Sequence, residues 1–204
     1  MPGKKQSAEN RLYSIAEEQM GFFTTRQAIE AGFQDANHSF HVKKGNWEKI
    51  LRGIYRMSRY PRNPESDFVI YSLWSRNREG APQGIYSHET ALSIFELSDA
   101  NPSKLHMTVP PSFRKNTQIP KILFLHKGII APSDTAEYGG YRVTRPARTV
   151  RDMLASASSN PQIIEQALAD GLQTGRITIN EMKTLYKDFP GQRHLFPASI
   201  RKKQ

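Results

Sequence analysis

The chain has 204 residues, of which 37% are hydrophobic, so it is long enough for two small domains and too apolar to be fully disordered. It carries 29 Lys and Arg against 19 Asp and Glu, a formal net charge of +10 that favours nucleic acid as a partner. The absence of cysteine excludes disulfides, thiol nucleophiles and zinc sites with Cys ligands.

The sequence contains no secretory signal and no long apolar run, so we expect a soluble, cytoplasmic protein without a membrane partner. Residues 1–63 contain 11 Lys and Arg and 6 Asp and Glu, a net charge of +5. The remaining 141 residues contain 18 and 13, again a net charge of +5. The positive charge is therefore denser in the N-terminal part but is not confined to it.

Two helices are predicted at the N-terminal end. We expect residues 1–6 to be disordered and residues 7–20 to form a helix, capped by Ser7, that braces the elements after it. A second helix is predicted to begin at Thr25, whose side-chain oxygen can cap free backbone N–H groups. It should end at Gly32, because glycine readily adopts the left-handed conformation that terminates helices.

The next segment predicts a short polar helix from about Asp35 to Lys44. Phe40 and Val42 are expected on its buried side, with Ala36 one turn earlier. Asn, Gln and Lys side chains can hydrogen-bond base edges, whereas Ser and Lys can reach phosphates. The outward side chains of this helix are therefore expected to read a DNA major groove.

A basic hairpin is predicted directly after this helix. Apolar residues flank Arg52-Gly53, and a glycine at this turn position suits the positive φ that a tight turn requires. One interpretation is a small ribbon whose arginines are only solvated. The other is a wing that follows the DNA backbone or enters the minor groove, and the two helices ahead of it favour this winged helix-turn-helix.

Three parts of this region are thus expected to bind DNA. The start of the second helix would contact phosphates, the third helix would read base edges, and two arginines would anchor the wing. The expected DNA-binding residues are Thr24, Thr25, Arg26, Gln27, Gln34, Asn37, His38, Ser39, His41, Lys43, Lys44, Arg52 and Arg56.

A polar segment with two prolines, residues 60–66, breaks the periodicity and is expected to link two domains. We place a winged helix-turn-helix domain at residues 1–62, a second domain at residues 67–190 and a basic, frayed tail at residues 191–204. The predicted fold class is α+β, with a mixed helix and strand C-terminal domain.

The second domain is expected to alternate between helical and strand periodicity. The predicted helices cover residues 67–76, 88–97 after the N-cap Ser87, 146–157, 161–172 and 180–186, and the predicted strands cover 105–109, 122–126 and 141–143. The loop 111–121 is basic and contains no acid, so contact with a phosphate backbone, contact with a protein and simple solvation all remain open. Arg145, Arg148 and Arg151 either hold an anion or meet solvent or a neighbouring Glu.

Two histidine pairs suggest a metal or structural role. His38 and His41 are three residues apart on one helix, a spacing that can hold a metal, but no third ligand lies nearby. We therefore assign them to DNA contact or plain surface. His106 and His126 fall on predicted strands and could be neighbours, for which a structural role is the more common one.

Catalytic motifs are missing from the sequence. The glycines form neither of the phosphate-binding motifs G-x-x-x-x-G-K-[ST] and G-x-G-x-x-G. The nucleophile elbow G-x-S-x-G is also missing. Glu181-Met182-Lys183 is the nearest match to a nuclease pattern, but it lies on a predicted helix without an acidic partner on a strand. We predict no enzymatic activity, no cofactor and no metal.

Several segments resemble one known family. TTRQAIEAG (24–32), the polar helix and WEKILRGIYR (47–56) resemble the N-terminal domain of AbiEi-type antitoxins. YSHETALSIFEL (86–97), LHMTVP (105–110) and YRVTRPARTVRDML (141–154) resemble the second domain of that family. The resemblance extends over roughly residues 13–172. It implies a chain that represses its own operon through the winged domain and counters a toxin of the nucleotidyltransferase type through the second domain.

The function expected from this resemblance is that of a transcriptional autorepressor and antitoxin in a bacterial toxin–antitoxin system for phage defence. The implied partners are double-stranded DNA repeats in its own promoter and the cognate toxin, which is countered functionally and not necessarily by direct binding. One alternative is a nuclease with a winged DNA-binding arm. Another is a regulator whose second domain senses a ligand.

Overall fold

The computed structural model describes residues 6–157 and 159–201, so most of the segment 1–6, expected to be disordered, lies outside the described residues. The chain divides into two compact units. The first comprises residues 1–84 together with 137–141, and the second comprises residues 85–136 and 142–204. The expected linker, residues 60–66, therefore falls inside the first unit.

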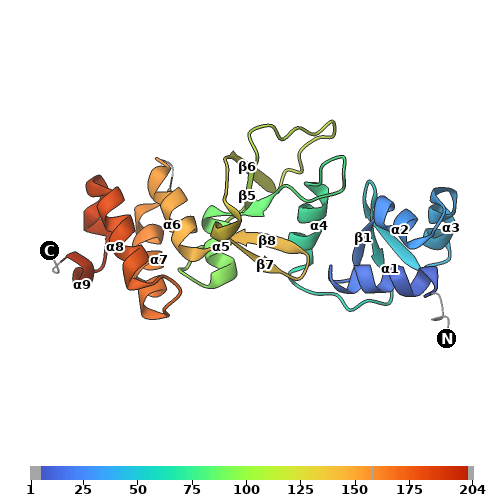
Figure 1. The fold of residues 1–204 in the computed structure, drawn as a ribbon, viewed down its shortest axis with the longest axis horizontal. Coiled ribbons are helices and arrows are strands. Elements are labelled where there is room, and N and C mark those ends of the chain that lie inside the picture. The colour runs from blue at the N-terminus through green and yellow to red at the C-terminus, as the bar shows by residue number, and fades with distance from the viewer. Residues whose placement is uncertain (1–5, 158, 202–204) are drawn as a thin grey trace. The chain divides into compact units, whose positions relative to one another are not determined.

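In its described residues, the first unit combines several short helices with a small sheet (Figure 1). Its elements are α1 (Ala8–Glu17), β1 (Phe22–Thr24), α2 (Thr25–Ala31), the 3-10 turn η1 (Asp35–Asn37), α3 (His38–Lys43), β2 (Trp47–Leu51), β3 (Ile54–Met57) and α4 (Ser66–Trp74). The strand order is β1-β3-β2, with β3 antiparallel to both neighbours. The predicted hairpin is confirmed, because Gly53 has φ +71° at the β2–β3 turn.

The core of the first unit lies between α1, α2 and the sheet. Leu12, Phe23 and Trp47 are buried there, and the small residues Ala16 and Ala28 let the helices approach closely. Full burial of a large apolar side chain contributes roughly 1.5–3 kcal/mol. Phe23 and Trp47 meet edge to face, with ring centroids 4.9 Å apart. β1 was not predicted, because three residues are too few to show a strand period.

The start of α2 at Thr25 agrees with the prediction, whereas α1 ends at Glu17 and not at residue 20. Ser7 caps α1 as expected, since its side chain accepts a hydrogen bond from the Asn10 backbone N–H. The N-cap of α2 is Thr24, not Thr25, and Gly32 ends that helix with the expected left-handed conformation. The polar helix begins only at His38, because the preceding residues 35–37 form a 3-10 turn.

The chain after residue 84 forms a five-stranded mixed sheet with helices after it, and all of this part belongs to the second unit except residues 137–141. The elements of this part are β4 (Ile85–Tyr86), α5 (His88–Phe95), β5 (Leu105–Val109), β6 (Leu123–Lys127), the 3-10 turn η2 (Pro132–Asp134), β7 (Thr135–Tyr138), β8 (Tyr141–Thr144), α6 (Pro146–Ala155), α7 (Pro161–Gln173), α8 (Ile179–Asp188), the 3-10 segment η3 (Pro190–Leu195) and α9 (Ala198–Arg201). The order is β6-β5-β4-β8-β7, so β6 and β7 are the edge strands. The strand pairs β5–β6 and β4–β8 are parallel.

The helices of the second unit pack in sequence. α5 packs on β5 and on α6, and α6 packs on α7 and α8 (Figure 1). The expected frayed tail is wrong for residues 191–201, because Leu195, Phe196 and Ile200 are buried. Residues 202–204 lie outside the described residues. In the part of the chain that the structure describes, no helix has the length and apolarity needed to cross a membrane.

Candidate nucleic-acid interface

The polar helix α3 and the segment before it present several side chains to solvent. Of the residues expected to bind DNA in this region, Gln34, Asn37, Ser39, Lys43 and Lys44 are exposed. α3 has six residues, so it is about 9 Å long and matches no more than about three base pairs along a groove. Any sequence reading by this helix therefore depends on few side chains.

The buried side of α3 differs from the prediction. His38 is only 3% exposed, whereas Phe40 is 53% exposed and the Lys44 ammonium lies 5.6 Å from the centre of its ring. The His38 ring packs edge-on against Trp47 and Tyr55, with centroids 5.3 and 5.8 Å away. His38 is therefore part of the core and is not a DNA-binding residue. The 3-10 turn changes the phase of the helix, which simple helical spacing from Asp35 does not anticipate.

His38 is neutral in this environment because burial lowers its pKa. Its Nδ1 lies 3.2 Å from an oxygen of Asp35, but the geometry is not that of a hydrogen bond, and neither ring nitrogen has a hydrogen-bond partner among the described residues. His41 is also held by packing, since its ring stacks on Trp47 at 4.5 Å. The two histidines are thus aromatic contacts of Trp47, and only part of His41 reaches solvent.

The start of α2 does not form the expected phosphate site. Thr24 is buried, and its hydroxyl accepts a hydrogen bond from the Gln27 backbone N–H. The Gln27 side chain in turn accepts from the Thr24 N–H and exchanges hydrogen bonds with Gln19. The Thr25 N–H donates to Gly53 O. These groups stabilise the helix start and are not available to an anion.

Arg26 is the exposed residue at the start of α2. Its guanidinium pairs with Glu30 at 2.7 Å and donates to the carbonyl of Arg78. Because an exposed ion pair is worth little, this contact can be exchanged for a phosphate. Arg26 therefore remains a candidate, although one with competing partners.

The two arginines expected to anchor the hairpin have different environments. Arg56 is 6% exposed, pairs with Glu48 at 2.9 Å and donates to the Tyr60 carbonyl at 2.8 Å. It is a structural residue, so its assignment to the interface is wrong. Arg52 is exposed at the turn, next to Gly53. Lys49 on β2 is exposed as well.

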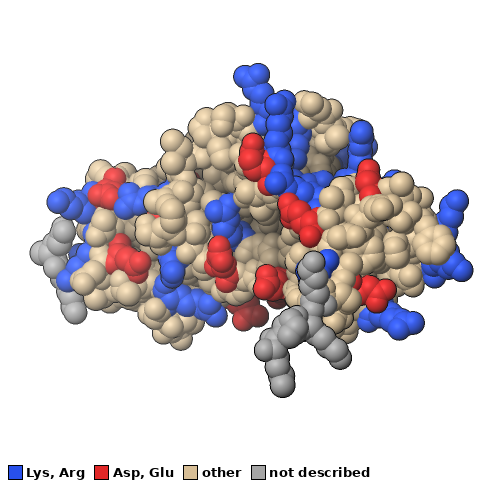
Figure 2. Space-filling model, turned by 45° about the vertical axis from the view of Figure 1, so that its right-hand side comes forward, with Lys and Arg blue, Asp and Glu red and all other residues tan. Residues whose placement is uncertain are grey.

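The candidate interface is therefore smaller than the sequence suggested. Its exposed members are Arg26, Gln34, Asn37, Ser39, Lys43, Lys44, Lys49 and Arg52, with the aromatic ring of Phe40 beside them. On the molecular face seen in Figure 2, basic side chains are interspersed with acidic ones. The chemistry suits a contact with a polyanion at a few points.

A cluster of three histidines lies in the second unit. His106 and His126, on the paired strands β5 and β6, are neighbours as the sequence suggested, with Nδ1 of His106 3.0 Å from Nε2 of His126. The His88 ring stacks on His126, with centroids 3.6 Å apart. Ser87 is the N-cap residue of α5 as expected, but its side chain makes no capping hydrogen bond; the hydroxyl contacts His88 Nδ1 and accepts from the Thr108 hydroxyl.

The cluster is electrically neutral near pH 7. Burial, together with the neighbouring imidazoles, lowers the pKa of His88 to about 3 and that of His126 to about 4. Burial also lowers the pKa of His106, which Glu89 partly opposes. His88 has φ +54°, an unusual conformation for a residue with a side chain. Neutral imidazoles in contact can share protons as hydrogen-bond donors and acceptors.

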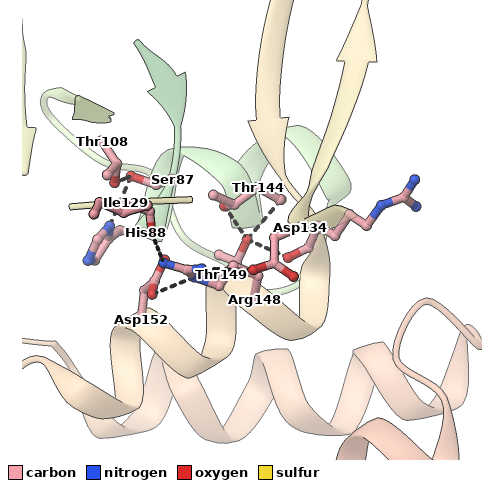
Figure 3. A network of polar contacts seen from close by, with 10 residues as sticks. Ser87, His88, Thr108, Ile129, Asp134, Thr144, Arg148, Thr149 and Asp152 are labelled. Atoms are coloured by element: carbon pink, nitrogen blue, oxygen red, sulfur yellow. Dashed lines mark hydrogen bonds and ion pairs between the residues drawn. The ribbon is translucent and has the colours of Figure 1, made fainter. Parts of the chain in front are cut away.

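A network of polar contacts engages Arg148 of α6 (Figure 3). The Arg148 guanidinium pairs with Asp134 and Asp152, each at 2.8 Å, and donates to the carbonyl of Ile129. Arg151 pairs with Asp188 at 2.8 Å. Both arginines therefore pair with acidic side chains, although these are aspartates and not the expected Glu.

The nuclease-like pattern of α8 has a local explanation. Glu181 forms a capping box with Thr178, and Met182 is buried. Within the described residues, no group of three or more His, Asp or Glu side chains is arranged to hold a metal ion.

No protein-family model matches this chain. No curated protein matches it either. Among solved structures it is similar to the crystal structure of the RV2827C protein from Mycobacterium tuberculosis, with a TM-score of 0.53 and 10% sequence identity, over 91% of this chain and 73% of that chain. At this identity the similarity shows the fold alone, and the chain is an α+β protein that shares this fold.

Proposed function

We propose that this protein is a DNA-binding transcriptional repressor with a winged helix-turn-helix in its first unit. The observation that carries the proposal is the exposure of Asn37, Lys43 and Lys44 on α3 and the turn before it, with Arg52 at the tip of the hairpin that follows. In this arrangement Asn37 reads a base edge, the lysines contact phosphates and Arg52 reaches the backbone or minor groove.

We further propose that the protein is the antitoxin of a toxin of the nucleotidyltransferase type. This part is supported by the resemblance of residues 86–97, 105–110 and 141–154 to AbiEi-type antitoxins. Co-expression with a nucleotidyltransferase-like gene from the same operon tests it, and the expected result is relief of the growth arrest that the toxin causes. Growth arrest that persists at equal toxin levels counts against the assignment.

The DNA-binding proposal is tested by titrating the protein with labelled DNA from its own promoter at several salt concentrations. Lys43→Ala and Lys44→Ala should each weaken binding to all sequences and lower the slope of log K against log salt by about 1. Asn37→Ala should instead reduce the preference for the promoter over unrelated DNA.

Lys187→Ala is the matched control, because Lys187 is an exposed lysine in the last turn of helix α8. It should leave affinity and salt slope unchanged. If all three interface variants bind as the unaltered protein does, α3 does not contact DNA in the proposed way.

A further inference from the structure

The chain segment that contains the edge strand β6 of the second unit carries several exposed apolar side chains. Nine large hydrophobic residues are exposed in the described ranges, and four of them lie within residues 119–129. These four are Ile119, Ile122, Phe124 and Ile129. Clustered apolar exposure of this kind marks interaction sites more often than scattered single residues do.

This segment contains the edge strand β6. β6 pairs with β5 on one side, and within the described residues no strand pairs with its other side. Ile122 and Gly128, which flank β6 at its two ends, both bond to β5: Leu105 N–H donates to Ile122 O, and Gly128 N–H donates to Val109 O. Because alternate residues of a strand direct their backbone groups to the same neighbour, the even-numbered residues between them also face β5. The backbone groups of Leu125 and Lys127 therefore point to the open side.

Of the four exposed residues, one is held by a ring contact of its side chain and another by a hydrogen bond to its backbone. Phe124 is 46% exposed, and its ring lies 5.1 Å from that of His106 on the neighbouring strand. Ile129 is 80% exposed, and its backbone carbonyl accepts a hydrogen bond from the Arg148 guanidinium. A fixed apolar surface loses little conformational entropy on binding.

The charge around this edge has one sign. Residues 100–133 contain five Lys and Arg and no Asp or Glu. Lys104, Arg114 and Lys121 of this segment are exposed, and none of them forms an ion pair within the described residues. Because the chain itself has a net charge of +10, a second copy is repelled and an acidic partner is attracted.

We propose that the outer edge of β6 accepts an extended acidic segment of another protein as an additional strand. The open backbone groups of Leu125 and Lys127 supply the hydrogen bonds, as in other cases of strand addition. Ile122 and Phe124 pack beside alternate apolar side chains of the segment, and the surrounding cations pair with its acids. This site is independent of α3, so the proposal does not rest on DNA binding.

A fluorescent peptide of alternating valine and glutamate tests the proposal on the full chain, with a peptide of alternating valine and lysine for comparison. We expect the acidic peptide to bind at least about tenfold more tightly. We also expect it to slow amide hydrogen exchange at Leu125 and Lys127. Equal binding of the two peptides, no binding, or no change in exchange overturns the proposal.

Two variants locate the site. Ile122→Glu combined with Phe124→Glu should weaken binding of the acidic peptide about tenfold or more, because it places acids on the same edge. Ile179→Glu is the matched control, since Ile179 is a similarly exposed isoleucine on α8. Circular dichroism and the unfolding temperature of each variant establish that it is folded.

Other occupants give different results. A single-stranded RNA oligonucleotide that displaces the peptide, and binds less well to the double variant, identifies a nucleic-acid surface instead. Sedimentation that shows a dimer lost in the double variant identifies a second copy of this chain. Either outcome overturns the proposal of an acidic protein segment, whereas promoter binding through α3 is measured separately and is unaffected by either.

Discussion

Individual side chains of similar chemistry have different roles in this molecule. Arg52 and Arg56 are four residues apart in one basic hairpin, yet Arg52 is exposed and Arg56 is enclosed by Glu48 and the Tyr60 carbonyl. Two residues that are four positions apart in one strand have their side chains on the same face of the sheet. Arg52, however, lies in the turn and Arg56 lies in β3, so this rule does not apply to them. Burial and not charge decides which of them is available to a ligand.

This difference gives a prediction for a matched pair of variants. Arg56→Ala should lower the free energy of unfolding by about 2 kcal/mol, because it removes a buried guanidinium and its hydrogen bonds. Arg52→Ala should change it by less than about 0.5 kcal/mol and weaken DNA binding instead. Urea unfolding and DNA titration of both variants measure the two effects. If Arg52→Ala instead lowers the free energy of unfolding and Arg56→Ala weakens DNA binding, then Arg52 stabilises the fold and Arg56 contacts DNA.

The loss in Arg56→Ala should also depend on pH. The hydrogen bond from Arg56 lowers the pKa of Glu48 from its ordinary value of 4.5. A carboxylate with a lowered pKa stabilises the folded state above its ordinary pKa, and this contribution disappears as the pH falls through the lowered value. The difference in the free energy of unfolding between the unaltered protein and Arg56→Ala should therefore become smaller at acidic pH.

At the scale of elements, neighbouring strands bring together side chains that are distant in sequence. β5 and β6 pair in parallel with His106 opposite Phe124 and Thr108 opposite His126. The start of α5 adds His88 to the same place. Three imidazoles thus share one partly buried environment, and each has a lowered pKa.

The histidine cluster predicts a loss of stability in mild acid. The unfolded chain binds protons near pH 6.5, whereas folded His88 and His126 bind them only near pH 3 and 4. These histidines therefore contribute their full stabilisation above about pH 6.5. Below that pH the free energy of unfolding falls, by roughly 3 kcal/mol between pH 7 and pH 5. His126→Gln should reduce this fall by roughly half.

Urea unfolding followed by circular dichroism at the two pH values measures the effect. His194→Gln is the control, because His194 is an exposed histidine outside the cluster. A fall of the same size in the unaltered protein and in His126→Gln contradicts the assignment of the pH dependence to this cluster.

At the scale of the whole molecule, the chain returns to its first unit long after leaving it. Residues 137–141 belong to that unit although they follow most of the second sheet. Tyr141 is buried, packs against Phe68 with ring centroids 5.2 Å apart, and lies within hydrogen-bond distance of Glu65. The hydroxyl of Tyr141 has a raised pKa, because burial and the Glu65 carboxylate disfavour its charged form.

Tyr141→Ala should therefore destabilise the first unit, by about 3 kcal/mol for the loss of a buried aromatic ring. Tryptophan fluorescence reports on this unit specifically, because the two tryptophans of the chain, Trp47 and Trp74, both lie in it. Tyr13→Ala is the control, since Tyr13 is half exposed on α1. Unfolding midpoints that do not differ between the two variants would show that residues 137–141 do not support the unit.

The sequence alone determined the local features of this protein. Ser7, Gly32 and Arg52-Gly53 predicted a helix start, a helix end and a turn, because caps and tight turns depend on a few adjacent residues. The strand at 105–109 was predicted in full from its alternation. These features give the α+β class.

Only the tertiary structure decided which polar side chains reach solvent. His38 and Phe40 exchanged their expected places because a 3-10 turn altered the phase of α3 and Trp47 and Tyr55 surround the histidine. Arg56 pairs with Glu48 on the neighbouring strand and is buried there. Tyr141 belongs to the first unit, although the rest of that unit ends more than fifty residues earlier in the chain. Burial results from contacts between elements that are distant in the chain, so local periodicity cannot predict it.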